Sequence, residues 1–417
     1  MREELAAVHV RVDGSRPSDL RVHDRAFYTR LLRDGALGFG EAYMDGQWDC
    51  QALDALTVKL IKGKLAQKYR TSWGNLLHVL RARALNLQSP LRAFQVGERH
   101  YDIGNDLYQA MLDRRLAYTC AYWKDAETLD AAQEAKLDLV CRKANLQPGM
   151  KVLDLGCGWG CFAKYAAEKY GVEATGFTVS KAQVELGRQL CQGLPVELRL
   201  EDYRKAAGTS AAVVSIGIME HVGNKNYRTY MEVADRCLKF DGVAVVHTIA
   251  GNVQGKDFNA WYDKYIFPNG VVPSLSQLTR AAEGLFVIED VHNIGPHYDR
   301  TLMAWCENFE QAWPTLKDKY GDRFYRMWRF YLVPDRKLAR IRDAACPAFP
   351  AEGARHSNAS SGAGMSRVVG SNSQYGRNRC RRSPGSGLRR STIRARVKRH
   401  GVACAVPARL PAQAGWR

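Results

Sequence analysis

An apolar run that ends in a glycine-rich turn constrains the fold of this chain more than any other feature. Residues 152–155 are mostly branched and apolar, and Gly156, Gly158 and Gly160 follow at alternate positions. A helical pattern then covers residues 161–170. This order predicts a buried parallel strand whose carboxyl end meets a ligand, because glycines let the backbone approach a ligand closely.

The spacing of these glycines limits the class of ligand. The pattern G-x-G-x-G differs from the dinucleotide fingerprint G-x-G-x-x-G, and no lysine follows it, which excludes a Walker-type phosphate loop. A tight strand-to-helix turn that binds nothing is the structural alternative. Together with Asp154 the turn reads D-x-G-x-G, which resembles the first motif of methyltransferases that use S-adenosylmethionine (SAM).

Strand and helix patterns alternate between residues 96 and 332, which predicts an α/β fold. Strands are expected at residues 151–155, 172–177, 196–201, 212–217, 242–249 and 286–290. Helical segments between most of them favour a doubly wound, mostly parallel sheet that binds ligands beyond the carboxyl ends of its strands. We therefore assign residues 96–332 to one methyltransferase domain.

Residues 1–95 are predicted to form a smaller, mainly helical domain. Apolar residues recur there at three- and four-residue spacing over residues 25–34, 53–69 and 74–87. Basic residues accompany them between Lys59 and Arg92, as in helices that lie on a membrane surface. A solvated helical face fits the same pattern, so both interpretations stay open.

The composition favours a cytoplasmic protein without a bound metal. The longest apolar runs are far shorter than the ~20 residues that a membrane-spanning helix needs. No apolar signal region follows Met1. The eleven cysteines are scattered without C-x-x-C pairs, which argues against a disulfide framework and against a zinc site.

The positive charge of the chain is concentrated in its last part. Residues 334–417 hold 18 Lys and Arg against 3 Asp and Glu, a surplus of 15, whereas the other residues hold 43 against 40, a surplus of 3. Beyond residue 332 the sequence becomes rich in Gly, Ser and Arg, a composition that cannot bury enough apolar surface to fold. We predict a basic, disordered tail over residues 333–417.

Several motifs in a fixed order extend the resemblance from one motif to a family. They are HYDIGNDLY at 100–108, YTCAYW at 118–123, MEHVG at 219–223, HTI at 247–249, YIFPNG at 265–270 and HYD at 297–299. The sequence LGFGEAYMDG at 37–46 fits an additional N-terminal domain. With the glycine turn, these motifs make residues 20–332 similar to the cyclopropane-fatty-acyl-phospholipid synthases and the related mycolic-acid cyclopropane synthases.

The resemblance implies an enzyme that transfers the SAM methyl group to a cis double bond of a phospholipid acyl chain. A carbocation then loses a proton and a cyclopropane ring closes. Peripheral contact with the phospholipid bilayer at the inner face of the membrane is implied as well, and so is a homodimer formed through the N-terminal domain. The implied SAM-binding residues are Asp154, Gly156, Gly158 and Gly160 at the turn, Tyr118 and Thr119 at the methionine end, Thr178 and Gln183 at the ribose, and Asp202 and Tyr203 at the adenine.

The resemblance also implies a bound bicarbonate ion as the base that removes the proton. Cys120, Glu220, His247 and Tyr298 would hold the ion, together with a backbone contact near Ile249. Thiol, imidazole, phenol and N–H groups can all donate hydrogen bonds to an anion. A carboxylate at Glu220 repels an anion unless it is protonated or orients a neighbouring group.

An alkene is a poor nucleophile, so the site must hold it in line with the methyl group and exclude water. Aromatic side chains are predicted to enclose the site and to stabilise positive charge, with ordinary core packing as the alternative for each of Tyr122, Trp123, Tyr265, Phe267 and Tyr298. His221 is predicted to point away from the site, on the assumption that Glu220 stands at an extended strand end.

The chain departs from the family pattern after residue 332. The Arg-, Ala-, Gly-, Ser- and Pro-rich sequence that follows favours translation of a GC-rich gene in a shifted frame over a nucleic-acid-binding tail, because aromatic stacking partners are nearly absent. We therefore expect no specific nucleic-acid partner, a missing closing strand and impaired activity. Two other functions stay open, an inactive remnant and a SAM methyltransferase that makes methyl-branched lipids or methylates a small amine.

Overall fold

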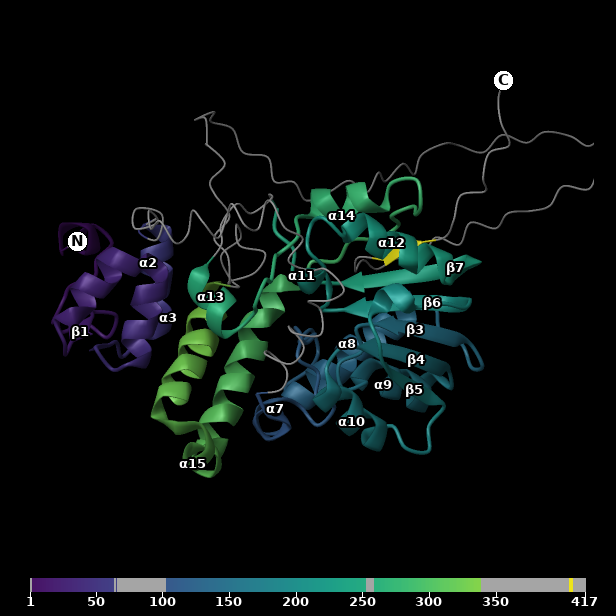
Figure 1. Cartoon of the computed structure of the whole chain (residues 1–417), viewed down its shortest axis with the longest axis horizontal. Helices are drawn as coiled ribbons and strands as arrows, with labels where there is room; N and C mark the ends of the chain where they lie inside the picture. Colours follow the sequence, from purple (N-terminus) through teal and green to yellow (C-terminus); the bar gives the residue numbers. More distant parts are fainter. Residues whose placement is uncertain (1, 64, 66–102, 253–258, 339–404, 408–417) are drawn as a thin grey trace, which may run out of the picture. The chain divides into compact units, whose positions relative to one another are not determined.

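The computed structural model describes residues 2–63, 65, 103–252, 259–338 and 405–407, and its central element is a six-stranded sheet (Figure 1). The strand order is β5-β4-β3-β6-β7-β8. The first five strands of this order pair in parallel. They are β3 (Lys151–Leu155), β4 (Glu173–Thr178), β5 (Val196–Leu200), β6 (Ser210–Ile216) and β7 (Leu238–His247).

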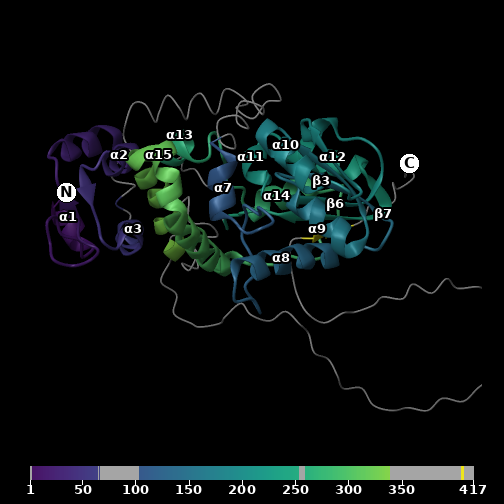
Figure 2. The same cartoon turned by 90° about the horizontal axis from the view of Figure 1, so that it is seen from below.

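Helices cover both faces of this sheet, as the sequence predicted (Figures 1 and 2). Side chains of β6 alternate between the faces: Val213 packs with α12 (Tyr227–Arg236) and α14 (Leu275–Ala282), whereas its neighbours Ala212 and Val214 pack with the opposite helices. Those opposite helices are α8 (Leu129–Lys143) and α9 (Cys161–Tyr170), while α10 (Lys181–Leu190) packs with β4 and β5. The doubly wound α/β fold is therefore confirmed.

The strand predicted at residues 286–290 is wrong. A turn over residues 283–285 follows α14, the backbone N–H of Phe286 donates to the carbonyl of Ala282, and residues 286–289 form no strand. Phe286 is buried, but Val287 and Ile288 are 46% and 37% exposed. An apolar run therefore predicted a strand where the structure instead places apolar side chains on the surface.

A strand also lies within the segment predicted to be a disordered tail. β8 (Ala405–Pro407) pairs antiparallel with β7, from Val243 to Val245. The expectation that no strand closes this edge of the sheet is therefore corrected. The last long helix of the domain also continues beyond residue 332, into the segment predicted to be the tail.

That last helix, α15 (Tyr298–Leu338), consists of two arms that meet at Gly321, where φ is 75° and ψ is 164°. The arms lie side by side in Figure 1, and the rings of Phe309 and Tyr325 stack between them at 5.8 Å. Four of the largest fully buried side chains belong to one apolar cluster to which α15 contributes, Trp48, Tyr108, Trp305 and Trp328. The helix therefore joins the N-terminal region to the domain that holds the six-stranded sheet.

The described N-terminal region holds α1 (Arg2–Ala7), β1 (Arg21–Val22), α2 (Ala26–Met44), β2 (Trp48–Asp49) and α3 (Leu53–Lys62). The helix predicted at 25–34 is confirmed, since α2 leaves helical geometry at Gly35 (φ 55°, ψ −127°) before a second helical stretch continues to Met44. The helix predicted at 53–69 is described as far as Lys62. The helix predicted at 74–87 and most of the basic residues named with it lie outside the described residues. Lys59 is engaged within this region, since its Nζ donates to Ser18 Oγ at 2.6 Å.

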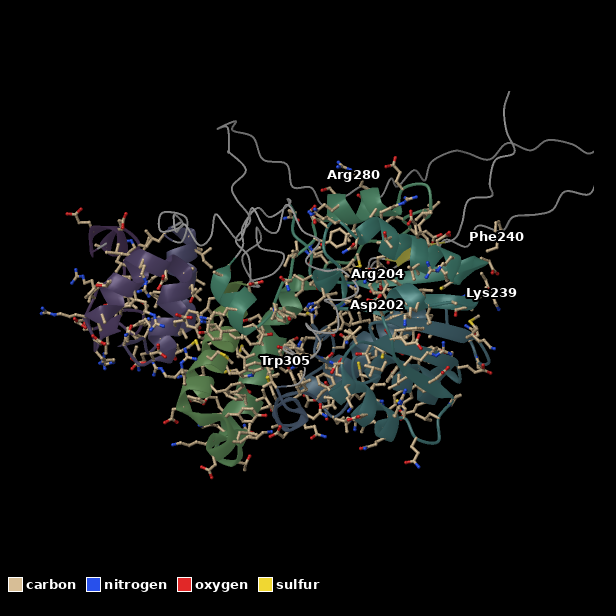
Figure 3. All side chains as sticks on the ribbon, in the orientation of Figure 1. Asp202, Arg204, Lys239, Phe240, Arg280 and Trp305 are labelled. Atoms are coloured by element: carbon tan, nitrogen blue, oxygen red, sulfur yellow. The ribbon has the colours of Figure 1, made fainter. Side chains whose placement is uncertain are left out.

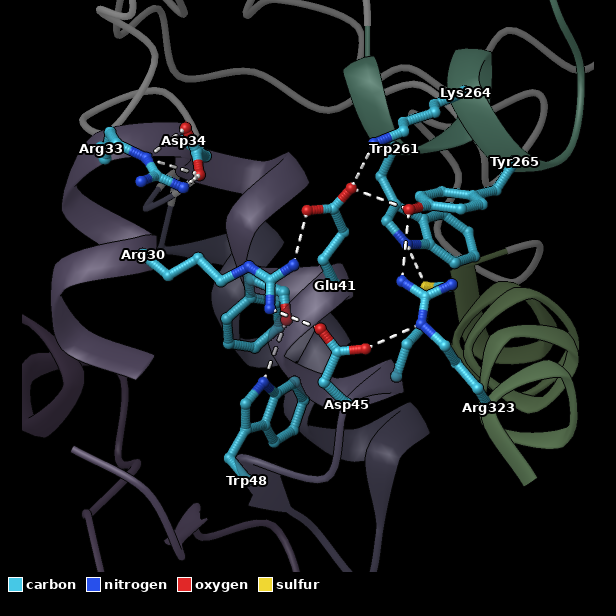
Figure 4. Close-up of polar contacts among 12 residues, drawn as sticks. Arg30, Arg33, Asp34, Glu41, Asp45, Trp48, Trp261, Lys264, Tyr265 and Arg323 are labelled. Atoms are coloured by element: carbon cyan, nitrogen blue, oxygen red, sulfur yellow. Dashed lines mark hydrogen bonds and ion pairs between the residues drawn. The ribbon is translucent and has the colours of Figure 1, made fainter. Parts of the chain in front are cut away.

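A network of charged groups ties α2 to α15 and to α13 (Ala260–Tyr265), as Figure 4 shows. Glu41 lies at its centre and accepts from Arg30 at 2.7 Å, from Lys264 at 2.6 Å and from the Tyr265 hydroxyl at 2.8 Å. Asp45 joins Arg30 to Arg323 on α15. Burial raises the pKa of Glu41, but the three hydrogen bonds outweigh burial and lower the pKa to about 2.

Replacing Glu41 by alanine is expected to lower the free energy of unfolding by about 2–3 kcal/mol, because two cations lose a buried partner. The pKa of Glu41 is depressed in the folded state, so its contribution is present above the ordinary value of 4.5 and is lost as pH falls through about 2. Urea unfolding at pH 7 measures the effect. Asp34→Asn is the matched control on the same helix, since Asp34 pairs with the exposed Arg33 and should change stability by less than about 0.5 kcal/mol. An equal loss in both variants would contradict a structural role for the network.

Candidate functional site

Two neighbouring cavities open at the carboxyl ends of the parallel strands. The first has a volume of about 160 Å³ and lies over the glycine turn that follows β3. The second has a volume of about 240 Å³ and lies beyond the end of β7. Both are lined by four common residues, Tyr118, Thr119, Gly217 and His221. The two spaces therefore share one wall, the arrangement required for transfer of a group from one ligand to another.

The glycine turn leaves the floor of the first cavity free of side chains. Gly156 and Gly158 have φ values of 113° and 56°, in the region that favours glycine. A Cβ at Gly158 would meet nothing closer than 3.9 Å, so it would project into open space, whereas one at Gly156 would lie 2.7 Å from Ile218 Cδ1. The turn is fixed to β4, because the N–H groups of Gly156 and Cys157 donate to the carbonyl of Phe177.

Nine of the ten residues expected to bind the cofactor line the first cavity, and Gly160 does not. The nine are Tyr118, Thr119, Asp154, Gly156, Gly158, Thr178, Gln183, Asp202 and Tyr203. Gly160 instead begins α9 with a φ of 83°, and a Cβ there would lie 2.9 Å from Leu198 Cδ1. Close packing of the helix against the sheet therefore accounts for this glycine, and its expected part in cofactor binding stays a prediction.

Polar groups surround the first cavity at the ends of the strands. The Thr178 hydroxyl donates to Gln183 Oε1 at 2.9 Å. Asp202 accepts from the Arg204 backbone at 2.9 Å and from its guanidinium at 2.8 Å. Figure 3 shows this pair at the opposite end of the sheet from Lys239, where β7 begins. The carboxyl ends of β4 and β5 therefore supply hydroxyl, amide and carboxylate oxygens to one space.

Asp154 is the buried carboxyl group of this cavity, and its Oδ1 has no hydrogen-bond partner among the described residues. Burial raises its pKa to about 7, against a lowering by the positive charge of Lys136. An acid whose pKa is higher in the folded than in the unfolded protein destabilises the folded state. This effect grows as the pH rises from the pKa of the unfolded state toward the pKa of the folded state.

Replacing Asp154 by asparagine is therefore expected to stabilise the ligand-free protein in a pH-dependent way. The gain in free energy of unfolding should be near zero at pH 4, grow toward pH 7 and then level off, with about 4 kcal/mol as its upper limit. Thermal unfolding between pH 4 and 8 measures this trend. SAM affinity of the same variant should fall, and a gain in stability that is independent of pH would contradict the ionisation of Asp154.

All four residues expected to perform the chemistry line the second cavity: Cys120, Glu220, His247 and Tyr298. Glu220 lies on the short helix α11 (Met219–Val222) rather than at a strand end. Its Oε1 accepts from the backbone N–H of Ile249 at 2.6 Å, and its Oε2 has no partner in the described part of the chain. The N–H of Ile249 donates to Glu220 in this structure, and its expected contact with a bound ion stays a prediction. Burial raises the pKa of Glu220.

Burial also favours the neutral forms of two neighbouring groups. It raises the pKa of the Cys120 thiol to about 12, and the thiol lies 3.7 Å from the carbonyl oxygen of Ile294. Burial lowers the pKa of His247 to about 3, helped by the positive charge of Lys136. The His247 Nδ1 has no hydrogen-bond partner within the described ranges. At neutral pH both groups can therefore donate to or accept from a ligand without carrying charge.

His221 contradicts the expectation that it points away, because it lines both cavities. A helical turn at α11 replaces the extended backbone on which that expectation depended. Burial lowers the pKa of His221 to about 4.

The aromatic wall also differs from the expectation. Phe267 and Tyr298 line the second cavity, but Tyr122, Trp123 and Tyr265 do not. Tyr331, which the sequence analysis did not name, lines the second cavity together with Tyr118, and the hydroxyl of Tyr118 donates to that of Tyr331 at 3.0 Å. Trp305, labelled in Figure 3, packs behind Tyr118 and Tyr298 with ring centroids 5.1 and 6.1 Å away.

The comparisons identify the family. The family model described as mycolic acid cyclopropane synthetase matches residues 88–348. A cyclopropane-fatty-acyl-phospholipid synthase of Escherichia coli is 46% identical over 341 residues, which cover 82% of this chain and 89% of that protein. A sphingolipid C9-methyltransferase of Emericella nidulans is 32% identical, with 85% of this chain and 70% of that protein covered.

Solved structures agree with this assignment. A cyclopropane synthase of Mycobacterium tuberculosis is similar with a TM-score of 0.56 and 29% identity, covering 60% of this chain and 94% of that one. A mycolic acid cyclopropane synthase complexed with SAH and CTAB has a TM-score of 0.57 and 32% identity, with the same coverage. Among the described helices, none combines the length and apolar character needed to cross a membrane. By its motifs, its fold and these relatives, the chain belongs to the cyclopropane synthase family of SAM-dependent methyltransferases.

Proposed function

We propose that this enzyme transfers the methyl group of SAM to the cis double bond of an unsaturated phospholipid acyl chain and closes a cyclopropane ring. The observation that carries the proposal is the pair of cavities with a common wall at Tyr118 and Thr119. The first has the polar strand ends and open glycine turn that suit SAM. The second is lined largely by apolar side chains that suit an acyl chain, among them Leu139, Val271 and Leu278.

The reaction requires one bond to break as another forms. The π electrons of the alkene attack the methyl carbon as its bond to sulfur breaks, which leaves S-adenosylhomocysteine and a carbocation on the chain. Loss of one proton from the transferred methyl group then allows the ring to close. The aromatic faces of Phe267 and Tyr298 would stabilise the cation by about 0.5–2 kcal/mol each, and the apolar walls exclude the water that would trap it.

We further propose that the proton acceptor is a bound bicarbonate ion. The buried Glu220 Oε2 and His247 Nδ1, both without partners among the described residues, fit an oxyanion that carries its own O–H. Cys120 and Tyr298 supply a thiol and a phenol on the same cavity. Bicarbonate would supply a base of suitable strength, while these side chains fix its orientation.

Four exposed apolar side chains support contact with a bilayer. Leu275, Val287, Ile288 and Val291 are between 37% and 46% exposed. Leu275 and Val291 also line the second cavity, so this apolar surface is continuous with the proposed acyl-chain site. We propose that this surface contacts the membrane and that an acyl chain enters there.

A double substitution tests the membrane proposal. Val287→Asp with Ile288→Asp should weaken binding to unsaturated phospholipid vesicles by about tenfold or more in a flotation assay, because two apolar contacts with lipid are lost. Leu32→Asp, at a 66% exposed position on α2, is the matched control and should leave binding within about twofold. Equal vesicle binding by all three proteins would place the bilayer contact elsewhere.

Expression of the full chain in a bacterium that lacks this activity tests the proposed reaction. Mass spectrometry of fatty-acid methyl esters should show monounsaturated chains that have gained one methylene group and resist hydrogenation. Unchanged chains, from a folded protein that binds SAM in calorimetry, would contradict the proposal. Failure to bind SAM would instead favour the inactive remnant, and a branched chain would favour the methyl-branching alternative. The same assay also tests the effect of residues 333–417. We expect the full chain to show lower turnover than the Escherichia coli relative expressed in the same way.

A further inference from the structure

A buried lysine lies between the two cavities, and the mechanism above gives it no role. Lys136 is on α8, is 1% exposed and lines the second cavity. Its Nζ donates to Thr119 Oγ1 at 2.9 Å. No carboxylate in the part of the chain that the structure describes forms an ion pair with it. A buried ammonium without a counter-ion is costly, so the position calls for an anion.

No described side chain that lines the second cavity forms an ion pair with the ammonium group of Lys136. Of the described residues that line it, Lys136 is the one lysine or arginine. Glu220 is the one acidic side chain in the same lining, and its carboxylate is occupied on one oxygen by Ile249. The thiol of Cys120, the imidazole of His247 and the phenol of Tyr298 are among the uncharged polar groups of the same lining. Lys136 thus forms no ion pair with the acidic side chain of this lining, although its charge lowers the pKa of the buried Asp154 of the first cavity.

The lysine is also held in place by its surroundings. Gln133, one turn earlier on α8, donates from Nε2 to the carbonyls of Ala117 and Thr119 at 3.0 and 2.8 Å. Gly217 leaves room for the threonine, since a Cβ there would lie 2.5 Å from Thr119 Cγ2. The shared wall is thus fixed from both sides, and Lys136 is oriented by that wall.

We propose that Lys136 is a positioning residue whose fixed positive charge holds a small oxyanion in the second cavity, of the carbonate or carboxylate class. We assign bicarbonate as this oxyanion, and the assignment rests on the proposed function. The other source is the methionine carboxylate of SAM, because Thr119 lines the first cavity as well. The experiment below separates the two.

The primary measurement is the binding of ¹³C-labelled bicarbonate to the full chain, which the broadening of its NMR line reports. Wild type should bind the ion, and Lys136→Met should weaken binding by more than about tenfold. Lys136→Arg keeps the charge and should stay within about threefold of wild type. Arg142→Gln, which removes an exposed cation from the same helix, is the matched control. If Lys136→Met does not fold, Lys136→Gln replaces it.

Two further measurements assign the source of the anion. SAM and 5′-methylthioadenosine, which lacks the carboxylate, should each bind Lys136→Met with nearly the wild-type dissociation constant. A loss of SAM affinity that 5′-methylthioadenosine does not share would overturn the assignment to bicarbonate. Equal bicarbonate binding by wild type and Lys136→Met, or none by wild type, would overturn the inference itself. Bicarbonate binding without bicarbonate-dependent turnover would refute the proposed base but leave the role of Lys136 intact.

Discussion

Glu220→Gln is expected to lower kcat by about 10²–10⁴-fold, the range found when acid–base catalysis is lost. Glutamine keeps the size of the side chain, and its amide oxygen can still accept from Ile249, so the local backbone should not move. What changes is Oε2, the buried atom that faces the second cavity without a partner among the described residues. An amide there cannot exchange a proton with a bound base.

The design of this measurement separates chemistry from binding. Initial rates with SAM and unsaturated phospholipid vesicles give kcat, and calorimetry gives the dissociation constant for SAM, which should stay within about threefold because Glu220 does not line the first cavity. Glu232→Gln, at an exposed site on α12, controls for the loss of one carboxylate. Wild-type turnover in Glu220→Gln, with cyclopropane still formed, would remove Glu220 from the catalytic residues.

Gly158→Val is expected to weaken SAM binding by about 10- to 100-fold, because branched carbon atoms would fill the space that the turn leaves open. A valine also resists the φ of 56° at this position. The two effects are separable, because Gly149 has a φ of 77° and open space around it but lies outside both cavities. Gly149→Val should therefore share the loss of stability and retain SAM affinity. Equal SAM affinity in wild type and Gly158→Val would show that the turn is not the binding site.

The glycine turn shows why much of this fold could be predicted from the sequence. An apolar strand, a turn that needs positive φ and a helix follow one another locally, so their limits depend on neighbouring residues alone. The predicted helix at 161–170 agrees with α9. Gly160 shows the limit of the same reasoning, because a glycine required by packing against Leu198 has the same spacing as one required by a ligand.

The failures concern features that only tertiary structure decides. The apolar run at 286–288 indicates a strand, but no local signal tells whether a sheet edge is available for it. Tyr331 lies far along the chain from Tyr118, and only the two arms of α15 bring the hydroxyl groups together. Lys136 stands between Ala135 and Leu137 on α8, but a lysine on a solvated helical face gives the same local pattern. His221 was misplaced because its direction depended on helix or strand geometry at α11.

The most direct test of the central claim uses purified full-length protein, unsaturated phospholipid vesicles and SAM with a trideuterated methyl group. The account predicts a product that retains two of the three deuterons in a new ring, because one deuteron leaves with the base before the ring closes. The product should therefore be heavier than the substrate by one CD₂ group and should resist hydrogenation. An unsaturated product that retains all three deuterons as a methyl branch, formed by proton loss from a chain carbon, or label on an amine instead of the acyl chain, would contradict cyclopropane formation by this enzyme.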